Sequence, residues 1–444
     1  MDELNINHKD ILIRLVSLAF VLIICICWPE KYNNQSIAIF LIITITLLYI
    51  SETEFIILFI ASFLAASFFA FVNYLLLTPD GLFETNWQEP LVSDSQFFLY
   101  QSRVFLTDFD PSALLSTWGS LIPVTYGAIA LSIFQNHYIG IVYLNCLLFA
   151  LSISHLSYMI DPVGKKFSVY MPVCLMPLQS FYNSMLAKEV LYLFLVIQLF
   201  YLHKLISESE EFKTLNILRL ITILTTLLLF RPTGALIFIC VIGYRAFSLD
   251  FKMKLGSILI FSLAAIFTLL LIDSINYTLP LFILGGNDEL SLDSHMTLNS
   301  IWMEAKGIPQ ILVPFFMPPW SVPLAPVLSI LWLISPLPLF GALIDSLIGF
   351  QIGRASFLDF ATVVRYLDSI IIFYILFQCI RLRLDVFKNT QPIILFLLIQ
   401  ILAISSLQFF ESGRHRYLPG VMFMILYIYY SSFEKSNQKF KTSP

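Results

Sequence analysis

The stretch KEVLYLFLVIQLFYLHKLI, residues 188–206, predicts a helix that crosses a membrane. Its apolar run between Lys188 and Lys204 approaches the length of about 20 residues that a helix needs to span the hydrocarbon of a bilayer. Comparable runs recur at residues 11–28, 36–51, 54–77, 138–160, 167–182, 189–206, 214–230, 233–247, 255–279, 366–382, 391–409 and 416–432. Because helices satisfy their own backbone polar groups in lipid, we expect an all-α, polytopic transmembrane helix bundle of about 12–14 spans.

Composition supports a single transmembrane domain over residues 1–444. The chain is 58% hydrophobic and only 12% charged, and its mean hydropathy is +0.85. Such a chain has too little polar surface to form a water-soluble globule of this size. All 6 cysteines lie within apolar runs, so neither a disulfide framework nor a zinc site is expected. The sequence indicates no nucleic-acid partner.

Two segments are compatible with more than one path through the membrane. Residues 113–135 contain Trp118, Gly119 and Pro123, and residues 322–350 contain several prolines. Each segment reads either as a re-entrant or interfacial element or as a pair of short helices. The chain also has no nucleotide-binding glycine-rich loop and no visible internal repeat, which disfavours an ATP-driven pump and a repeat-built transporter.

The distribution of Lys and Arg predicts the orientation. If each ambiguous segment crosses an even number of times, a cytoplasmic N-terminus places most of the 25 Lys and Arg residues inside. The C-terminal tail, 433–444, is then cytoplasmic as well. Two long loops face outward: the first, 78–135, is expected to hold interfacial helices, and the second covers 280–321. We therefore expect an integral membrane protein with its polar apparatus on the outer face.

The segment SDSQFFLYQSR, residues 93–103, places Asp94 at the start of an aromatic, apolar turn. A carboxylate at the water boundary can take a proton from a sugar hydroxyl that lies within hydrogen-bonding distance. Asp94 could equally cap the helix that begins there. Spacing alone leaves both readings open.

The segment TDFDP, residues 107–111, places Asp108 and Asp110 two residues apart. In an extended chain these carboxylates point to the same side and could share a divalent cation, Mg²⁺ or Mn²⁺, that also holds a phosphate. The alternative is a solvated acidic turn before a proline. A divalent cation is thus a possible cofactor.

Basic residues gather at predicted outer helix ends: Arg414, His415 and Arg416, together with Arg231 and Lys188. A guanidinium at the membrane interface can bind phosphate with two parallel hydrogen bonds, and a lipid-linked phosphate lies at that depth. Alternatively, these side chains extend toward water, anchor helix ends or pair with nearby acids.

Four motifs together resemble the polytopic GT-C glycosyltransferases of bacterial envelopes: DSQFFLY at 94–100, NSMLAKEVLYLFLVIQL at 183–199, FRPTGALIFI at 230–239 and RHRYLPG at 414–420. The resemblance implies an active site at the outer membrane surface, a polyprenyl-phosphate-linked sugar as donor and an envelope glycan as acceptor. Asp94 would be the catalytic base, and the segment from Arg414 to Arg416 would hold the lipid phosphate, with Arg231, Lys188 and Tyr100 as further substrate contacts. The chain departs from the family in its three spans before the Asp94 loop, in His415 and in Gly420.

Two other functions remain open. A Wzy-type O-antigen or capsule polymerase would join two lipid-linked oligosaccharides and also carries arginines in outer loops. A non-enzymatic flippase of lipid-linked glycans needs charges deep within its helices to line a cavity. Asp273 and Asp345 are the candidates for such charges.

Overall fold

The computed structural model describes six continuous segments and a set of short pieces. The segments are residues 53–77, 94–108, 121–160, 182–186, 188–208 and 214–248, and the pieces are 15, 19, 38, 41–46, 344, 347–348, 363–364, 366–374, 377, 393, 396 and 399–400. The chain divides into two compact units, residues 1–201 with 431–444 and residues 202–430. Each unit is described by itself.

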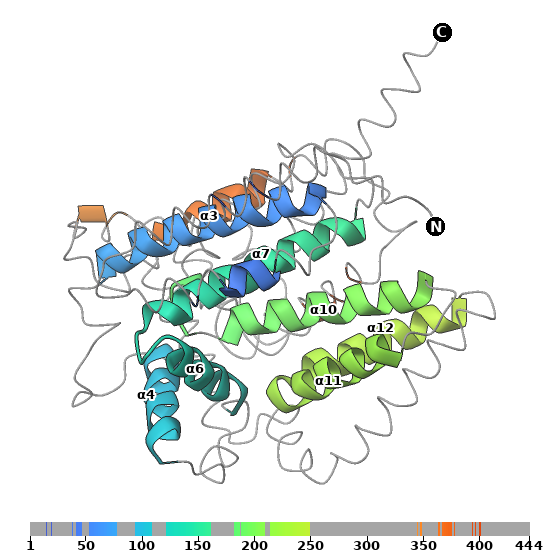
Figure 1. Ribbon diagram of the computed structural model, residues 1–444. Helices are drawn as coiled ribbons and strands as arrows, with labels where there is room; N and C mark the ends of the chain where they lie inside the picture. Colours follow the sequence, from blue (N-terminus) through green and yellow to red (C-terminus); the bar gives the residue numbers. More distant parts are fainter. Residues whose placement is uncertain are drawn as a thin grey trace, which may run out of the picture. The chain divides into compact units, whose positions relative to one another are not determined.

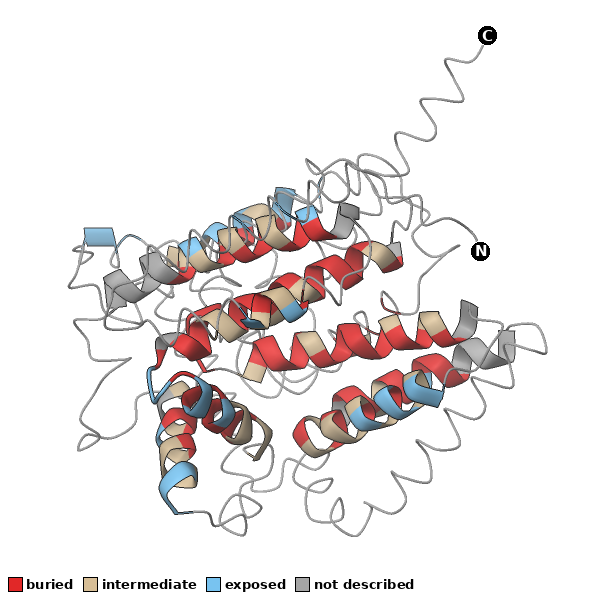
Figure 2. Cartoon of the chain, viewed as in Figure 1, coloured by how far each residue is buried: buried red, intermediate tan, exposed pale blue. Residues whose placement is uncertain are grey.

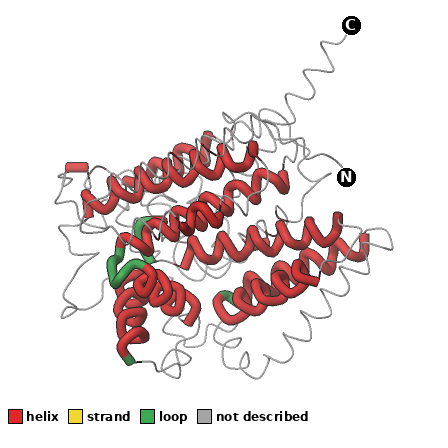
Figure 3. Tube along the Cα trace, in the orientation of Figure 1, coloured by secondary structure: helices red, strands yellow, loops and turns green. Residues whose placement is uncertain are grey.

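All regular structure in these segments is helical, as the apolar runs predict (Figures 1 and 3). The helices are α3 (Thr53–Leu77), α4 (Asp94–Thr107), α6 (Leu121–Ile133), α7 (Ile139–Ile160), α10 (Lys188–Glu208), α11 (Thr214–Phe230) and α12 (Pro232–Ser248). The prediction of an all-α chain is confirmed for the described residues. Of the ambiguous segment 113–135, residues 121–133 form α6.

Two of the described helices are long and apolar enough to cross a membrane, Gly140–Met159 of α7 and Lys188–Ile206 of α10. Both are buried along most of their length (Figure 2). Shorter apolar helices cover Ile56–Ala70, Leu121–Ile133, Thr214–Phe230 and Gly234–Gly243. The bundle of about 12–14 spans, its orientation and its outer loops stay predictions.

In the first unit, α3 packs along α7 (Figure 1). The buried face of α3 includes Phe59, Phe63, Ala66 and Ala70, which recur every three or four residues and so fall on one side of the helix. Small residues let helix backbones approach closely in lipid. The ring of Phe63 meets the ring of Tyr143 on α7, with centroids 6.4 Å apart.

Helices α4 and α6 also pack on each other, beside the N-terminal end of α7 (Figure 1). The Ser102 hydroxyl of α4 donates to the Phe98 carbonyl (2.6 Å) and reaches the Val124 carbonyl of α6 (3.0 Å). Gly127 faces this contact, because a Cβ there would collide with the Ser102 hydroxyl and lie 2.7 Å from Leu186 Cδ2. The absence of a side chain at residue 127 thus allows α4 and α6 to lie this close.

In the second unit, α11 and α12 form a packed pair joined by Arg231 alone. Pro232 suits the first position of α12, because that position needs no backbone N–H, and a proline disfavours helical geometry in the residue before it. The Arg231 N–H still donates to the Leu227 carbonyl (2.7 Å), while its own carbonyl accepts from the N–H of Gly234 (3.0 Å). Arg231 therefore ends one helix and begins the next.

Candidate functional site

Asp94 is the first residue of α4, as the sequence predicts. The helix runs 14 residues to Thr107. Its inward face begins with Phe98 and Leu99, which are both buried, and continues with Ser102. The position of Asp94 agrees with both of its readings, as catalytic base and as helix cap.

Lys188 is the first residue of α10, and its side chain meets the first turns of α4. Its Nζ lies 5.0 Å from the centroid of the Phe98 ring, in a cation–π contact. Phe98 follows Asp94 by four residues, about one helical turn. The structure thus brings the beginning of α10 to the first turns of α4.

The helix dipole does not explain a cation at this end of α10. Backbone N–H groups give a helix N-terminus a partial positive charge, which favours acids and disfavours bases. Glu189, in the same first turn and 5% exposed, follows this rule, whereas Lys188 opposes it. Lys188 and the N-terminus of α10 together favour an anion such as a phosphate.

The hydroxyl of Tyr138, the residue before α7, holds the turn that precedes α10. It donates to the Ser184 carbonyl (3.0 Å) and accepts from the Leu186 N–H (3.2 Å). Burial raises the pKa of Tyr138 well above its usual value, although hydrogen bonding to the hydroxyl opposes that shift. The hydroxyl therefore keeps its proton at physiological pH and can donate to Ser184.

Asn145 fixes the same turn from α7. Its Nδ2 donates to the carbonyls of Asn183 (3.1 Å) and Met185 (2.7 Å), and its Oδ1 accepts from the Tyr126 hydroxyl of α6 (2.9 Å). The carboxamide is 1% exposed and so forms these bonds away from water, where an unpaired amide is costly. One side chain thus links α6, α7 and the 182–186 turn.

Of the other residues predicted to contact substrate, the structure describes Tyr100 and Arg231. Tyr100 is 40% exposed and follows Phe98 by two residues, which turns it about 200° around α4 to another face. Arg231 belongs to the second unit and is half-buried. Arg414, His415 and Arg416 lie outside the described residues, as do the loop 280–321, the tail 433–444, Asp273 and Asp345.

The predicted cation site stays a prediction. Asp108 is exposed just after α4, and its N–H donates to the Val104 carbonyl (2.7 Å), while Asp110 lies outside the described residues. Within the segments that the structure describes, no three His, Cys, Asp or Glu side chains are grouped so as to hold a metal ion. A pair of carboxylates at 108 and 110 is not tested by this finding.

The sequence reading gave no role to Tyr138, Asn145 and Asn183. The sequence does contain a signal for Asn145, because a carboxamide within a membrane-spanning run is costly unless it forms hydrogen bonds. His155 and Gln198 carry the same signal: Gln198 Nε2 lies 2.5 Å from His155 Nδ1, between α7 and α10. The His155 ring also stacks on Tyr201, with centroids 4.1 Å apart.

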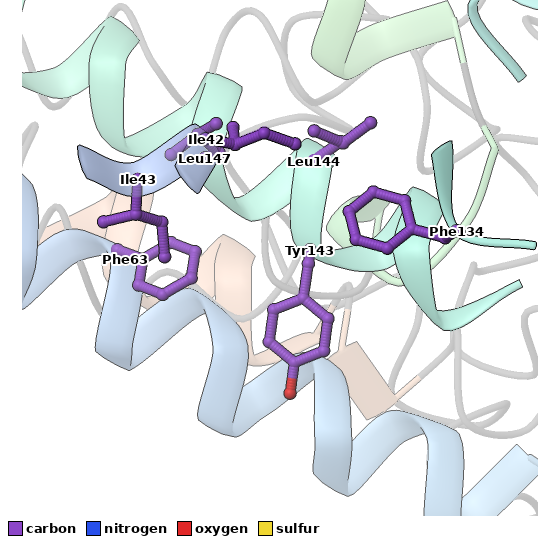
Figure 4. A pocket seen from close by; sticks show the side chains of 7 residues that line it. All are labelled: Ile42, Ile43, Phe63, Phe134, Tyr143, Leu144 and Leu147. Carbon is purple, nitrogen blue, oxygen red and sulfur yellow. The ribbon is translucent and has the colours of Figure 1, made fainter. Parts of the chain in front are cut away.

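A separate hollow in the first unit is apolar (Figure 4). It is a partly open hollow of about 190 Å³, a volume that includes open solvent, and it is lined by Ile42, Ile43, Phe63, Phe134, Tyr143, Leu144 and Leu147. The Tyr143 hydroxyl points away from the other side chains. Since a specific ligand site needs convergent polar groups, this hollow is not the candidate site.

Comparison of the chain with protein-family models, with curated proteins and with solved structures finds no match. The cluster formed by the first turns of α4, the 182–186 turn and Lys188 is therefore interpreted from its own geometry. In this cluster, the basic side chain of Lys188 and the N-terminus of α10 lie beside the first turns of α4, the helix that begins at Asp94.

Proposed function

We propose that the chain is a membrane glycosyltransferase that moves a sugar from a polyprenyl-phosphate donor to an envelope glycan on the outer face of the bacterial inner membrane. The observation that carries this proposal is the contact of Lys188 with Phe98, one turn after Asp94. Glycosyl transfer from a lipid phosphate requires a base for the acceptor and positive charge for the leaving phosphate. The cluster contains a residue of each type.

In the proposed reaction, the Asp94 carboxylate takes the proton of the acceptor hydroxyl. The acceptor oxygen forms a bond to the anomeric carbon from the face opposite the lipid, and the bond between that carbon and the phosphate oxygen breaks. Both electrons of the broken bond leave with the polyprenyl phosphate, and the configuration inverts because the acceptor attacks from the opposite face. Lys188 offsets the negative charge that develops there, and the resemblance implies the same role for Arg414 and Arg416, with Arg231 as a further contact.

Membrane helices fit this substrate. α7 and α10 are long and apolar enough to lie in the bilayer that holds the polyprenyl chain. Lys188 and the Asp94 turn lie at the beginnings of their helices, where a helix meets the polar headgroup region. A lipid phosphate at that depth would reach Lys188 without leaving the membrane.

The test is the glycan made by a deletion strain, and by the same strain carrying Asp94→Asn or Lys188→Gln. Each variant removes one charge, which typically lowers the rate on the order of 10²-fold or more. We expect loss of one sugar from every repeat with chain length unchanged, seen by mass spectrometry and on a gel ladder. Glu208→Gln, the same acid-to-amide change at the last residue of α10, is the matched control and should give normal glycan.

Two outcomes would change the proposal. Collapse of the ladder to one repeat unit in the deletion and Asp94→Asn strains would identify a polymerase. Normal glycan in the Asp94→Asn strain, with the protein present in the membrane at its usual level, would remove Asp94 from the reaction.

A further inference from the structure

The side chain of Asn183 is buried with no hydrogen bond. It is 0% exposed, and neither Oδ1 nor Nδ2 has a partner in the part of the chain that the structure describes. Buried carboxamides in folded proteins are almost always bonded, because an unmade hydrogen bond leaves the full cost of losing water. This residue therefore needs an explanation that stability does not provide.

Loose packing of the turn does not explain it. Asn145 Nδ2 donates to the Asn183 carbonyl (3.1 Å), and Tyr138 holds the Ser184 carbonyl (3.0 Å) and the Leu186 N–H (3.2 Å). The backbone of the turn is thus fixed from α7 and from the residue before it. The Asn183 carboxamide therefore takes no part in the hydrogen bonds that hold the backbone of residues 183, 184 and 186.

The turn lies within the candidate site. Asn183 precedes Lys188 by five residues, and the Lys188 Nζ lies over the ring of Phe98 on α4. The unbonded carboxamide therefore belongs to the short segment that leads to the predicted phosphate contact.

We infer that the Asn183 carboxamide binds a hydroxyl group of the sugar that is transferred; this inference rests on the proposed function. A carboxamide offers both an acceptor and donors. A phosphate only accepts and an ammonium only donates, so either would leave half of the carboxamide unbonded. A sugar hydroxyl both donates and accepts, and it can satisfy Oδ1 and Nδ2 through neighbouring hydroxyls. The side chain is 0% exposed, so this role requires the residues that cover it to move when the sugar binds.

This role predicts opposite effects of one substitution on stability and on activity. Asn183→Leu keeps the approximate size and removes both unbonded atoms, so we expect the melting temperature in detergent to rise by roughly 2 °C. A strain that carries the variant should nevertheless lose the sugar, as the Asp94→Asn strain does. Asn216→Leu, the same change at a half-buried position of α11, is the matched control and should give normal glycan.

Binding measurements with the lipid phosphate alone and with lipid-linked sugars distinguish recognition of the sugar from recognition of the phosphate. Undecaprenyl phosphate alone should raise the melting temperature of the wild-type protein and of Asn183→Leu equally. Among undecaprenyl-phosphate glucose, galactose, mannose and N-acetylglucosamine, the cognate donor should add a further rise in the wild-type protein only. No further rise in the wild-type protein, or the same rise in the variant, overturns the inference.

Other outcomes also decide it. Normal glycan from Asn183→Leu beside defective glycan from Asp94→Asn overturns the role of Asn183 and leaves the proposed function standing. Normal glycan from both strains overturns both. A lower melting temperature in Asn183→Leu shows a structural role, such as binding a buried water, and overturns the inference. Asn183→Ala, which adds no atoms, is the second variant for the glycan test, and it must also lose the sugar.

Discussion

Replacing Asn145 with leucine should weaken the contact between α6, α7 and the 182–186 turn. The substitution removes three hydrogen bonds at once, those to the carbonyls of Asn183 and Met185 and that from the Tyr126 hydroxyl. Leucine has a similar size, so the main change is the loss of these bonds. Tertiary hydrogen bonds between membrane helices contribute about 0.6 kcal/mol each, so three give about 2 kcal/mol.

The assay is reversible unfolding of the purified protein in mixed micelles. We expect Asn145→Leu to lower the free energy of unfolding by about 2 kcal/mol and Tyr126→Phe to lower it by about 0.6 kcal/mol. In the double variant the cost of Tyr126→Phe should disappear, because its partner oxygen is already gone. Ser152→Ala is the control on the same helix, since that hydroxyl bonds only the Leu148 carbonyl one turn away (2.7 Å).

The reasoning fails if Asn145→Leu changes the free energy of unfolding no more than Ser152→Ala does. It also fails if Tyr126→Phe costs the same with and without Asn145, because the two side chains would then not be bonded to each other in the membrane protein.

Two further substitutions test the packing of the first unit by the same unfolding assay. Gly127→Ala should lower the free energy of unfolding by about 1–3 kcal/mol, because its methyl group meets Ser102; helix propensity alone favours alanine by about 1 kcal/mol, so a gain in stability would contradict the close contact. His155→Leu should cost about 1–2 kcal/mol through the lost bond to Gln198 and the lost stacking on Tyr201. His155→Phe keeps the ring and should cost less, and equal costs would show that stacking contributes nothing.

Helix positions follow closely from the sequence. The apolar runs 54–77, 138–160, 189–206, 214–230 and 233–247 match α3, α7, α10, α11 and α12 within two residues at each end. This agreement arises because an apolar run in lipid has no other way to satisfy its backbone. The start of α4 at Asp94 was also predictable, since aspartate, serine and glutamine there are typical of a helix N-terminus.

The partners of the site residues were not predictable in the same way. Tyr138 bonds residues 46 and 48 positions later, and Asn145 bonds residues 38 and 40 positions later. No local pattern encodes such pairs, because hydrophobic periodicity gives the face of a helix but not its neighbour. Asn183 directly follows the predicted span 167–182, so its position in the sequence is that of a connecting residue.

The bonds of the Tyr138 hydroxyl have a consequence for the order in which the chain assembles during synthesis. The hydroxyl donates to the Ser184 carbonyl and accepts from the Leu186 N–H, 46 and 48 residues later in the chain. Translation proceeds from the N-terminus at about 5–20 residues per second, so Tyr138 is made several seconds before Leu186. During that interval the hydroxyl lacks both partners. Burying an unpaired hydroxyl is costly, so we expect Tyr138 to keep contact with water until residues 184–186 are made.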